Sequence, residues 1–362
     1  MTTKIFIITG EESGDRLGAD LIRKARESSN FFDIEFQGIG GEMMHEQGMN
    51  SIFPLEDIAV MGLTEIIPKF PVIFARLDQT VKAIVKFKPD IVISIDCPDF
   101  SLRVQKRLRK DNRFKTRQIH YVAPTVWAWR EGRARAVSKY LDKILCLYPF
   151  EPQYFQKYGL DADFVGHPVV ERHIPQTSEQ DFKKRNGLPS SHELVGLYPG
   201  SRRGEIKRHA PVFADCMKAL KNQGQLKDIH FIIPTFDRFV PELEQHFSEI
   251  LQDVSFITQE SEKQKAMSVL TSALCVNGTI GLELAMAKVP HITVYKTGWL
   301  TAFIARHMIH VDHMHLVNIL KDHGCLGSSD EQIIVPEFVQ EDVRVLFVSV
   351  SSVLLPFKFI WV

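Results

Sequence analysis

Short apolar runs alternate with longer stretches of helical periodicity along most of the chain. In the first half we predict strands at 5–8, 35–39, 91–95, 118–122 and 143–147. Each is a short apolar run bounded by turn residues, which is typical of a strand buried in a parallel sheet. Between the first two, the spacing of Leu17, Leu21 and Ala25 predicts a helix over 17–26. This alternation predicts an α/β fold with a doubly wound parallel sheet.

The second half of the chain repeats the alternation. We predict strands at 193–198, 229–234, 254–257 and 273–276, and helices at 205–223, 240–252 and 263–272. Between the halves, the polar stretch 176–190 follows Pro175 and contains Pro189, which is typical of a passage between domains. We therefore expect two Rossmann-like, doubly wound domains, one over 1–175 and one over 190–340.

The segment 58–87 is unusually apolar and carries Pro68 and Pro71 with Lys69 and Arg76 beside them. Two interpretations are open. A proline-broken apolar segment with flanking cations could dip into a membrane interface. The contact would then be made by Phe70, Val72, Ile73 and Phe74. Apolar side chains are more often buried, so a hydrophobic core is the alternative.

Composition excludes several classes of protein. Hydrophobic residues make up 44% of the 362 residues, enough for the cores of about two domains. The formal net charge is zero, so no global field favours nucleic acid as a partner. Five scattered cysteines without C-x-x-C spacing disfavour a disulfide framework and a zinc module, and fit a reducing cytoplasm. No apolar run suits a signal peptide or reaches the roughly 18 residues of a spanning helix, so we expect neither secretion nor membrane insertion.

Two stretches of the first half carry candidate chemistry at the carboxyl ends of predicted strands. Gly10-Glu11-Glu12-Ser13-Gly14-Asp15 lacks the G-x-G-x-x-G fingerprint, and its carboxylates suit hydroxyl groups better than phosphates. Capping of the next helix by Ser13 or Asp15 is the structural alternative. Asp96 follows the strand at 91–95, where ligands of open α/β sheets bind, and is a candidate general base. Asp96 or Asp99 could instead cap the helix that follows.

Aromatic side chains gather at and after the strand at 118–122. His120, Trp127 and Trp129 could form a stacking wall for a sugar or a base. The same rings could equally belong to the core. Arg130 and Arg133 add local positive charge just beyond them.

Two loop-to-helix junctions of the second half are candidate anion seats. At Gly200 and Ser201 the chain turns out of its strand so that free amides and a helix N-terminus face back, and Arg202 can add a bidentate contact. An ordinary turn with surface arginines is the alternative. Asn277-Gly278-Thr279 forms a second seat, and Glu283 lies one helical turn on, where a carboxylate can accept two ribose hydroxyls. Together the seats predict a bound nucleoside diphosphate.

Four histidines, His307, His310, His313 and His315, lie close to Asn318. Their spacing fits one helical face only in part, and apolar residues intervene. We therefore expect solvated or hydrogen-bonded imidazoles here rather than a metal site.

Several of these motifs resemble those of the lipid-A-disaccharide synthases, bacterial inverting hexosyltransferases of the GT-B architecture, in which two Rossmann-like domains face a cleft. The similarity extends from the start of the chain to about residue 340. The matching stretches are 10–15 (GEESGD), 59–62 (AVMG), 95–100 (IDCPDF), 120–130 (HYVAPTVWAWR), 149–151 (PFE), 164–168 (FVGHP), 199–202 (PGSR) and 278–283 (GTIGLE).

The resemblance implies transfer of 2,3-diacylglucosamine from UDP-2,3-diacylglucosamine to 2,3-diacylglucosamine 1-phosphate, with release of UDP, in the synthesis of lipid A for lipopolysaccharide. Asp96 matches the family's base and Glu11 a second important acid. Arg202 matches a diphosphate-facing arginine, and Asn318 a functional asparagine. Helix N-termini and Arg202 would stabilise the leaving diphosphate, so no metal or cofactor is expected. Acylated substrates favour the membrane interpretation of 68–74, with peripheral attachment to the cytoplasmic face of the inner membrane.

Two stretches depart from the family pattern. Residues 321–332 form a longer loop than usual. Residues 341–362 form an atypical apolar tail that resembles a truncated or frameshifted terminus, where the family has a helical tail that can help a homodimer form. The alternative functions are a UDP-GlcNAc 2-epimerase-like or other GT-B enzyme on a soluble substrate, and a non-catalytic protein that binds a UDP-sugar or a lipid.

Overall fold

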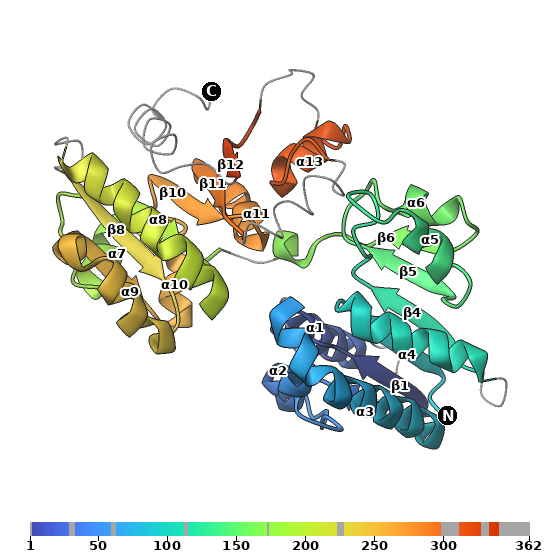
Figure 1. Cartoon of the computed structure of the whole chain (residues 1–362). Helices are drawn as coiled ribbons and strands as arrows, with labels where there is room; N and C mark the ends of the chain where they lie inside the picture. The colour runs from blue at the N-terminus through green and yellow to red at the C-terminus, as the bar shows by residue number, and fades with distance from the viewer. Residues whose placement is uncertain are drawn as a thin grey trace. The chain divides into compact units, whose positions relative to one another are not determined.

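The computed structural model describes residues 2–28, 33–58, 63–111, 115–171, 174–222, 228–297, 311–326 and 333–339, with 63–69 described by their backbone alone. The chain divides into two compact units, unit 1 (1–168) and unit 2 (169–362). Each unit holds a six-stranded sheet flanked by helices (Figure 1). Every strand pair is parallel. The predicted α/β class with two Rossmann-like sheets is confirmed.

Unit 1 has the strand order β2-β1-β3-β4-β5-β6. Its strands are β1 (Thr3–Ile8), β2 (Ile34–Ile39), β3 (Ile91–Ile95), β4 (Arg117–Tyr121), β5 (Lys143–Cys146) and β6 (Asp161–Phe164). Its helices are α1 (Glu12–Glu27), α2 (Glu42–Glu46), α3 (Leu63–Phe87), α4 (Pro98–Lys110), α5 (Gly132–Val137) and α6 (Pro152–Gln156). The chain steps from β1 to β2 on one side and to β3 on the other. The topological switch point, where such sheets bind ligands, therefore lies between β1 and β3.

Unit 2 has the strand order β12-β11-β10-β7-β8-β9. Its strands are β7 (Glu193–Tyr198), β8 (Ile229–Pro234), β9 (Val254–Ile257), β10 (Ser272–Val276), β11 (His291–Tyr295) and β12 (Glu337–Val339). Its helices are α7 (Glu179–Arg185), α8 (Arg203–Asn222), α9 (Val240–His246), α10 (Glu260–Ala266), α11 (Thr279–Met286) and α13 (Leu316–Asp322). The same logic places the switch point of this sheet between β7 and β10.

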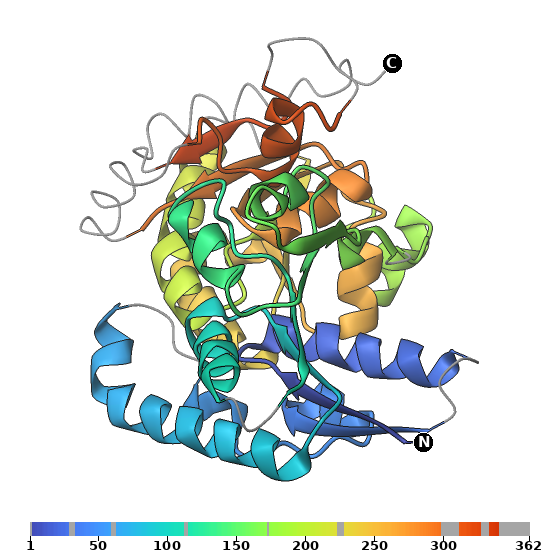
Figure 2. The same ribbon diagram turned by 90° about the vertical axis from the view of Figure 1, so that its right-hand side faces the viewer.

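Successive side chains of each strand enter different hydrophobic clusters. In β1, Phe6 and Ile8 pack with Leu77 of α3, whereas Ile5 and Ile7 pack with Ile22 of α1. Figure 2 shows α1 and α3 on opposite faces of this sheet. Because both faces are covered, residues 5–8 of β1 are all apolar and buried instead of alternating with polar residues.

The prolines of the apolar segment do not break it, contrary to our expectation. Helix α3 runs continuously through Pro68 and Pro71. A proline inside a helix costs about 3 kcal/mol. Leu77 and Ile84, further along the same helix, are fully buried in the core and recover about 1.5–3 kcal/mol each. Packing of the later turns thus offsets the missing hydrogen bonds.

The polar stretch 176–190 is also not a simple passage between domains. It contains α7, which begins at the side-chain cap of Ser178, and Phe182 of this helix is fully buried in the core of unit 2. The stretch therefore belongs to unit 2. The family-like motif at 59–62 and the tail at 341–362 lie outside the described residues. None of the helices in the described part of the chain has the length and apolar character needed to span a bilayer.

Candidate active site

The loops that follow β1 and β3 pack directly on each other at the switch point of unit 1. A Cβ added to Gly10 would lie 2.3 Å from Cys97 Sγ, so only glycine allows this approach. Across the contact, Ser13 Oγ lies 3.5 Å from Asp96 Oδ2 and donates toward it. The structure therefore brings Ser13 and Asp96 together, a contact that we did not predict from the sequence.

Asp96 and Cys97 form a turn in which both residues have a left-handed backbone, with φ of 52° and 46°. Non-glycine residues seldom adopt this conformation, and its cost is met by the surrounding structure. Here Asp96 N donates to Tyr121 O (3.0 Å), and Ser101 Oγ donates to Asp96 O (2.8 Å). The turn thus presents the Asp96 side chain from a fixed backbone at the carboxyl end of β3.

Glu11 and Asp96 act electrostatically on the same thiol. Glu11 is the N-cap residue of α1, and Cys97 is half-buried between the two loops. Burial raises the pKa of the Cys97 thiol to about 12, and the charges of Glu11 and Asp96 contribute to that rise. Two carboxylates therefore share this edge of the sheet with a thiol that stays protonated at neutral pH.

Asp15 has a structural role. Its buried carboxylate accepts hydrogen bonds from the backbone N–H groups of Gly41, Met43 and Met44, at 2.6–3.2 Å. These amides belong to the N-terminal turn of α2, so Asp15 caps that helix and not its own. Asp99 is exposed and pairs with Arg133 at 3.1 Å.

His120 lies on β4 next to the site but is fully buried. Its Nδ1 is 2.7 Å from Ser94 Oγ on β3, and Gln105 of α4 donates to the same hydroxyl. Burial lowers the pKa of His120 to about 3, with a smaller contribution from the Arg133 charge. The neutral ring therefore joins β3, β4 and α4 behind the edge of the sheet that carries Asp96.

Trp127 and Trp129 are both half-buried. Trp127 Nε1 donates to Glu151 Oε1 at 3.1 Å, and its ring packs edge-on against Phe150. Trp129 is covered by the guanidinium of Arg130, 4.1 Å from the ring centroid, and lies near that of Arg133. Glu151 and Phe150 were not predicted as site residues.

The two predicted anion seats of unit 2 follow β7 and β10, which are hydrogen-bonded neighbours with Tyr198 opposite Cys275. At the first seat Gly200 has φ of +124°, and a Cβ there would lie 2.5 Å from Glu205 Cβ. Glu205 occupies the seat: its Oε2 accepts from Ser201 N at 3.0 Å and its Oε1 lies 3.3 Å from Arg202 Nη1. Helix α8 begins at Arg203, two residues before the predicted start.

At the second seat Gly278 is the N-cap of α11, with φ of +155° and open space where a Cβ would stand. Asn277 Nδ2 donates to Met314 O at 2.9 Å, and among the described residues its buried Oδ1 has no hydrogen-bond partner. Thr279 is exposed at the helix start and Glu283 is half-buried one turn on. Burial raises the pKa of the Tyr198 phenol, and the charges of Cys275 and Glu283 contribute, so Glu283 lies near the end of β7.

Asn318 is buried and fully engaged with protein atoms. Its Nδ2 donates to Val335 O (2.8 Å) and Glu337 Oε1 (2.6 Å), and its Oδ1 accepts from the amides of Ile334 and Val335. Glu337 Oε2 in turn accepts from Met314 N at 2.7 Å. The network supports the loop that holds Asn277.

Two of the four clustered histidines fall within the described residues. His313 Nδ1 lies 2.7 Å from Asp322, and His315 Nε2 lies 3.2 Å from His291 Nε2. Burial lowers the pKa of His315 to about 3. Across the described ranges, no three His, Cys, Asp or Glu side chains are grouped so that they could hold a metal ion. His307 and His310 lie outside those ranges.

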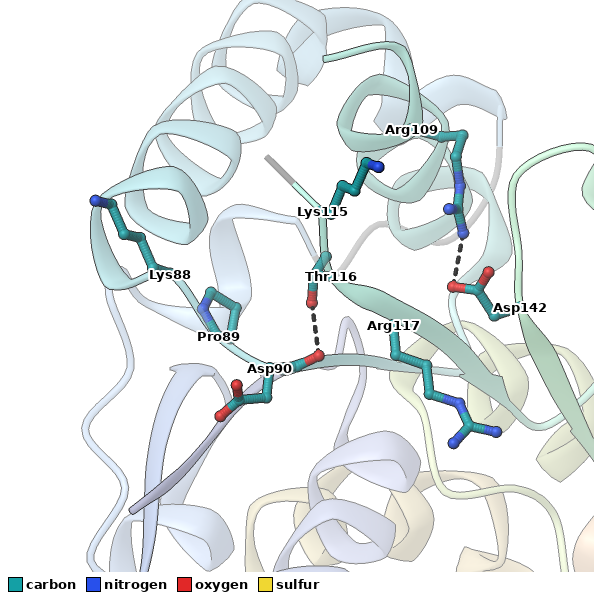
Figure 3. A pocket seen from close by; sticks show the side chains of 8 residues that line it. All are labelled: Lys88, Pro89, Asp90, Arg109, Lys115, Thr116, Arg117 and Asp142. Carbon is teal, nitrogen blue, oxygen red and sulfur yellow. Dashed lines mark hydrogen bonds and ion pairs between the residues drawn. The ribbon is translucent and has the colours of Figure 1, made fainter. Parts of the chain in front are cut away.

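One hollow on unit 1 lies away from these residues. It has a volume of about 690 Å³ and lies at the amino ends of β3 and β4, opposite the edge that carries Asp96. Figure 3 shows Arg109 paired with Asp142, and the Lys88 and Arg117 side chains pointing away from each other. Its cations do not converge, so we do not assign the site there.

Solved structures share this fold. They include UDP-GlcNAc 2-epimerase from Neisseria meningitidis (TM-score 0.57, 13% identity, 97% of this chain and 100% of that one). A glycosyltransferase from Rickettsia africae gives a TM-score of 0.54 at 12% identity over 99% of this chain and 89% of that one. Such identities show the fold alone. Two Rossmann-like units, each with polar loops at its switch point, make this a protein of the GT-B fold class.

Sequence relatives specify the family. The family model described as lipid-A-disaccharide synthetase matches residues 5–355. A lipid-A-disaccharide synthase of Rhodospirillum centenum is 42% identical over 342 residues, covering 93% of this chain and 81% of the relative. That of Ruegeria pomeroyi is 37% identical over 341 residues, covering 90% and 83%. The chain belongs to the lipid-A-disaccharide synthase family and is a glycosyltransferase of lipid A biosynthesis, acting on a sugar nucleotide and a lipid-linked glucosamine.

Proposed function

We propose that the donor is UDP-2,3-diacylglucosamine, the acceptor 2,3-diacylglucosamine 1-phosphate, and the reaction a single inverting displacement. The observation that carries the proposal is Asp96, held on a constrained left-handed turn at the switch point with Ser13 donating toward its carboxylate. A carboxylate at this place can remove a proton from an acceptor hydroxyl.

In the proposed reaction, Asp96 takes the proton of the acceptor hydroxyl while the oxygen of that hydroxyl forms a bond to C1 of the donor sugar. The bond between C1 and the diphosphate oxygen breaks, and its electron pair leaves with UDP. Ser13 orients Asp96, and Glu11 supplies a second carboxylate for sugar hydroxyls. Trp127 and Trp129 would line the acceptor side, with His120 supporting them from behind.

The nucleotide would bind to unit 2. The amides after Gly200, with Ser201 and Arg202, would receive the diphosphate and stabilise its developing charge. Asn277, Gly278 and Thr279 would form the second contact, since Asn277 Oδ1 has no hydrogen-bond partner among the described residues and a Cβ at Gly278 would meet open space. Glu283 would accept ribose hydroxyls, and Asn318 would act through the loop it supports.

The lipid chains would reach unit 1 at helix α3. Phe70, Val72 and Phe74 are 45%, 41% and 48% exposed, whereas Ile73 packs against the core. Phe74 also lines a small hollow with Arg103 and Lys106 of α4. Exposed apolar groups beside cations suit an anionic membrane surface. We therefore propose peripheral attachment to the cytoplasmic face of the inner membrane, and a homodimer, which light scattering would test.

The test is UDP release by the purified chain in detergent micelles with EDTA present. We expect release that depends on the diacylated acceptor and persists in EDTA. Deacylated acceptor should support little turnover. Release without acceptor, or equal rates with a deacylated one, would favour an epimerase-like or soluble-substrate enzyme instead.

A further inference from the structure

A buried carboxylate beside Trp127 has no part in the proposed chemistry. Glu151 is 1% exposed and lies just before α6. Its Oε1 accepts from Trp127 Nε1 at 3.1 Å. Its Oε2 accepts from the backbone amides of Leu147 (3.0 Å) and Tyr148 (3.1 Å). One side chain thus joins the loop after β4 to the turn after β5.

Four rings follow one another around this carboxylate, and we call them the aromatic row: Trp127, Phe150, Tyr148 and His167. Trp127 meets Phe150 edge-on, with centroids 5.3 Å apart and planes at 82°. Phe150 and Tyr148 are stacked at 5.8 Å, and Tyr148 and His167 at 5.9 Å. Phe150 is buried, and the other three rings are half-buried. The aromatic row therefore presents partly exposed rings that are held by the buried Phe150 and Glu151.

The aromatic row lies at the same edge of the sheet as Asp96. Ile95 pairs with Tyr121, and Tyr121 pairs with Leu145, so only β4 separates the strand before Asp96 from the strand before Tyr148. Two strand spacings amount to about 10 Å. The Asp96 charge also contributes to raising the pKa of Tyr148, after burial and Glu151. Tyr148 therefore keeps its proton and can donate a hydrogen bond near Asp96.

We propose that Glu151 is a positioning residue that fixes the aromatic row as the wall on which the acceptor sugar binds. Pyranose rings combine apolar C–H faces with hydroxyl groups, and half-buried aromatic rings with a phenol offer matching contacts. Tyr148 and His167 then contact the acceptor in addition to Trp127. This inference rests on the proposed function.

The ionised form of Glu151 is the one that makes all three bonds, because each partner is an N–H donor. Burial raises the pKa of Glu151 to about 7. A proton on Oε1 would break the one hydrogen bond that this oxygen accepts from Trp127. Oε2 would keep its two hydrogen bonds from backbone amides. The titratable neighbours, Cys146 and Tyr148, both have raised pKa values and stay neutral. The wall should therefore loosen as pH falls below about 7.

The test is steady-state transfer with saturating donor and varied acceptor, in E151Q and W127F. W127F keeps a ring against Phe150 but lacks the Nε1 donor. We expect each variant to raise the acceptor KM about tenfold, because each loses the hydrogen bond between Trp127 and the charged Glu151. The donor KM should stay within about twofold of that of the unmodified chain. E151Q in the W127F background should add no further change. The acceptor KM of the unmodified chain should rise below pH 7, and that of E151Q should not.

D142N is the matched control. Asp142 also accepts a backbone amide, that of Gln118, and pairs with Arg109, but at the opposite edge of the same sheet. We expect D142N to lower the melting temperature without changing the acceptor KM. If E151Q and W127F do the same, the inference is overturned while the proposed function stays intact. If E151Q does not fold, the pH profile of W127F is the test: without the Nε1 donor to Glu151, its acceptor KM should not rise below pH 7, and a rise equal to that of the unmodified chain would overturn the inference. Absence of acceptor-dependent turnover in the unmodified chain would overturn both.

Discussion

At the residue scale, Glu205 holds the groups that we propose bind the nucleotide. Its carboxylate takes the Ser201 amide and lies 3.3 Å from the Arg202 guanidinium. A diphosphate would compete with this carboxylate for the same donors and be repelled by its charge. The loop after β7 is therefore already ordered before UDP binds, with the Glu205 carboxylate in the place proposed for the diphosphate.

We predict that E205Q binds UDP about threefold to tenfold more tightly, because the amide can still accept one bond but carries no charge. Isothermal titration calorimetry with UDP measures this. E242Q, which removes a charge 3.8 Å from Arg203 without touching Ser201, is the control. Weaker UDP binding by E205Q would show that the carboxylate supports the seat instead of competing for it.

Sequence position was enough to place Asp96 directly after a buried strand, at the edge of the sheet where ligands of this fold class bind. It was not enough to find Glu151, since nothing in Pro149-Phe150-Glu151 tells that the carboxylate lies beneath Trp127. Asn318 illustrates the same limit. Its resemblance to a functional asparagine does not reveal that every polar atom of its amide is bonded to unit 2 itself.

At the element scale, most strands were predicted, and β6, β11 and β12 were not. The bounds of β7, β8 and β9 match the prediction to the residue. The edge strands β6 and β12 were missed because Asp161–Phe164 alternates with exposed acids and Glu337–Val339 is only three residues long. β11 was also missed, although it is central and mostly buried. Helix α3 was misjudged because its prolines lie ahead of the turns that anchor it in the core.

Helix α3 also carries the prediction on membrane contact. We expect the F70S/F74S double variant to bind anionic phospholipid vesicles about tenfold more weakly, because two exposed rings lose their apolar contact. Vesicle sedimentation measures this, and added salt should weaken binding further by screening the α4 cations. F164S removes an equally exposed ring from β6 and is the control. Equal binding by F70S/F74S and the unmodified chain would contradict the proposed surface.

At the scale of the whole molecule, buried neutral histidines make stability depend on pH. His120 in unit 1 and His315 in unit 2 both have folded pKa values lowered by burial to about 3. The unfolded chain, with histidine pKa near 6.5, binds protons more readily, so the free energy of unfolding falls as pH drops below about 6.5.

We predict a loss of about 2 kcal/mol for each of these two rings at pH 5, in both units. Urea unfolding at pH 7.5 and pH 5 measures this, and the unfolding midpoint should move to lower urea at pH 5. A midpoint that stays the same or rises would show that one or both rings are solvated and protonated in the folded chain.

The central claim is that Asp96 removes the acceptor proton, and the most direct measurement is the turnover and UDP affinity of D96N. Asparagine keeps the shape of the side chain but cannot accept the proton. We predict a fall in turnover of about 100- to 10,000-fold, with the UDP dissociation constant unchanged within about twofold, because the proposed nucleotide site lies in unit 2. Near-normal turnover by D96N would contradict the account.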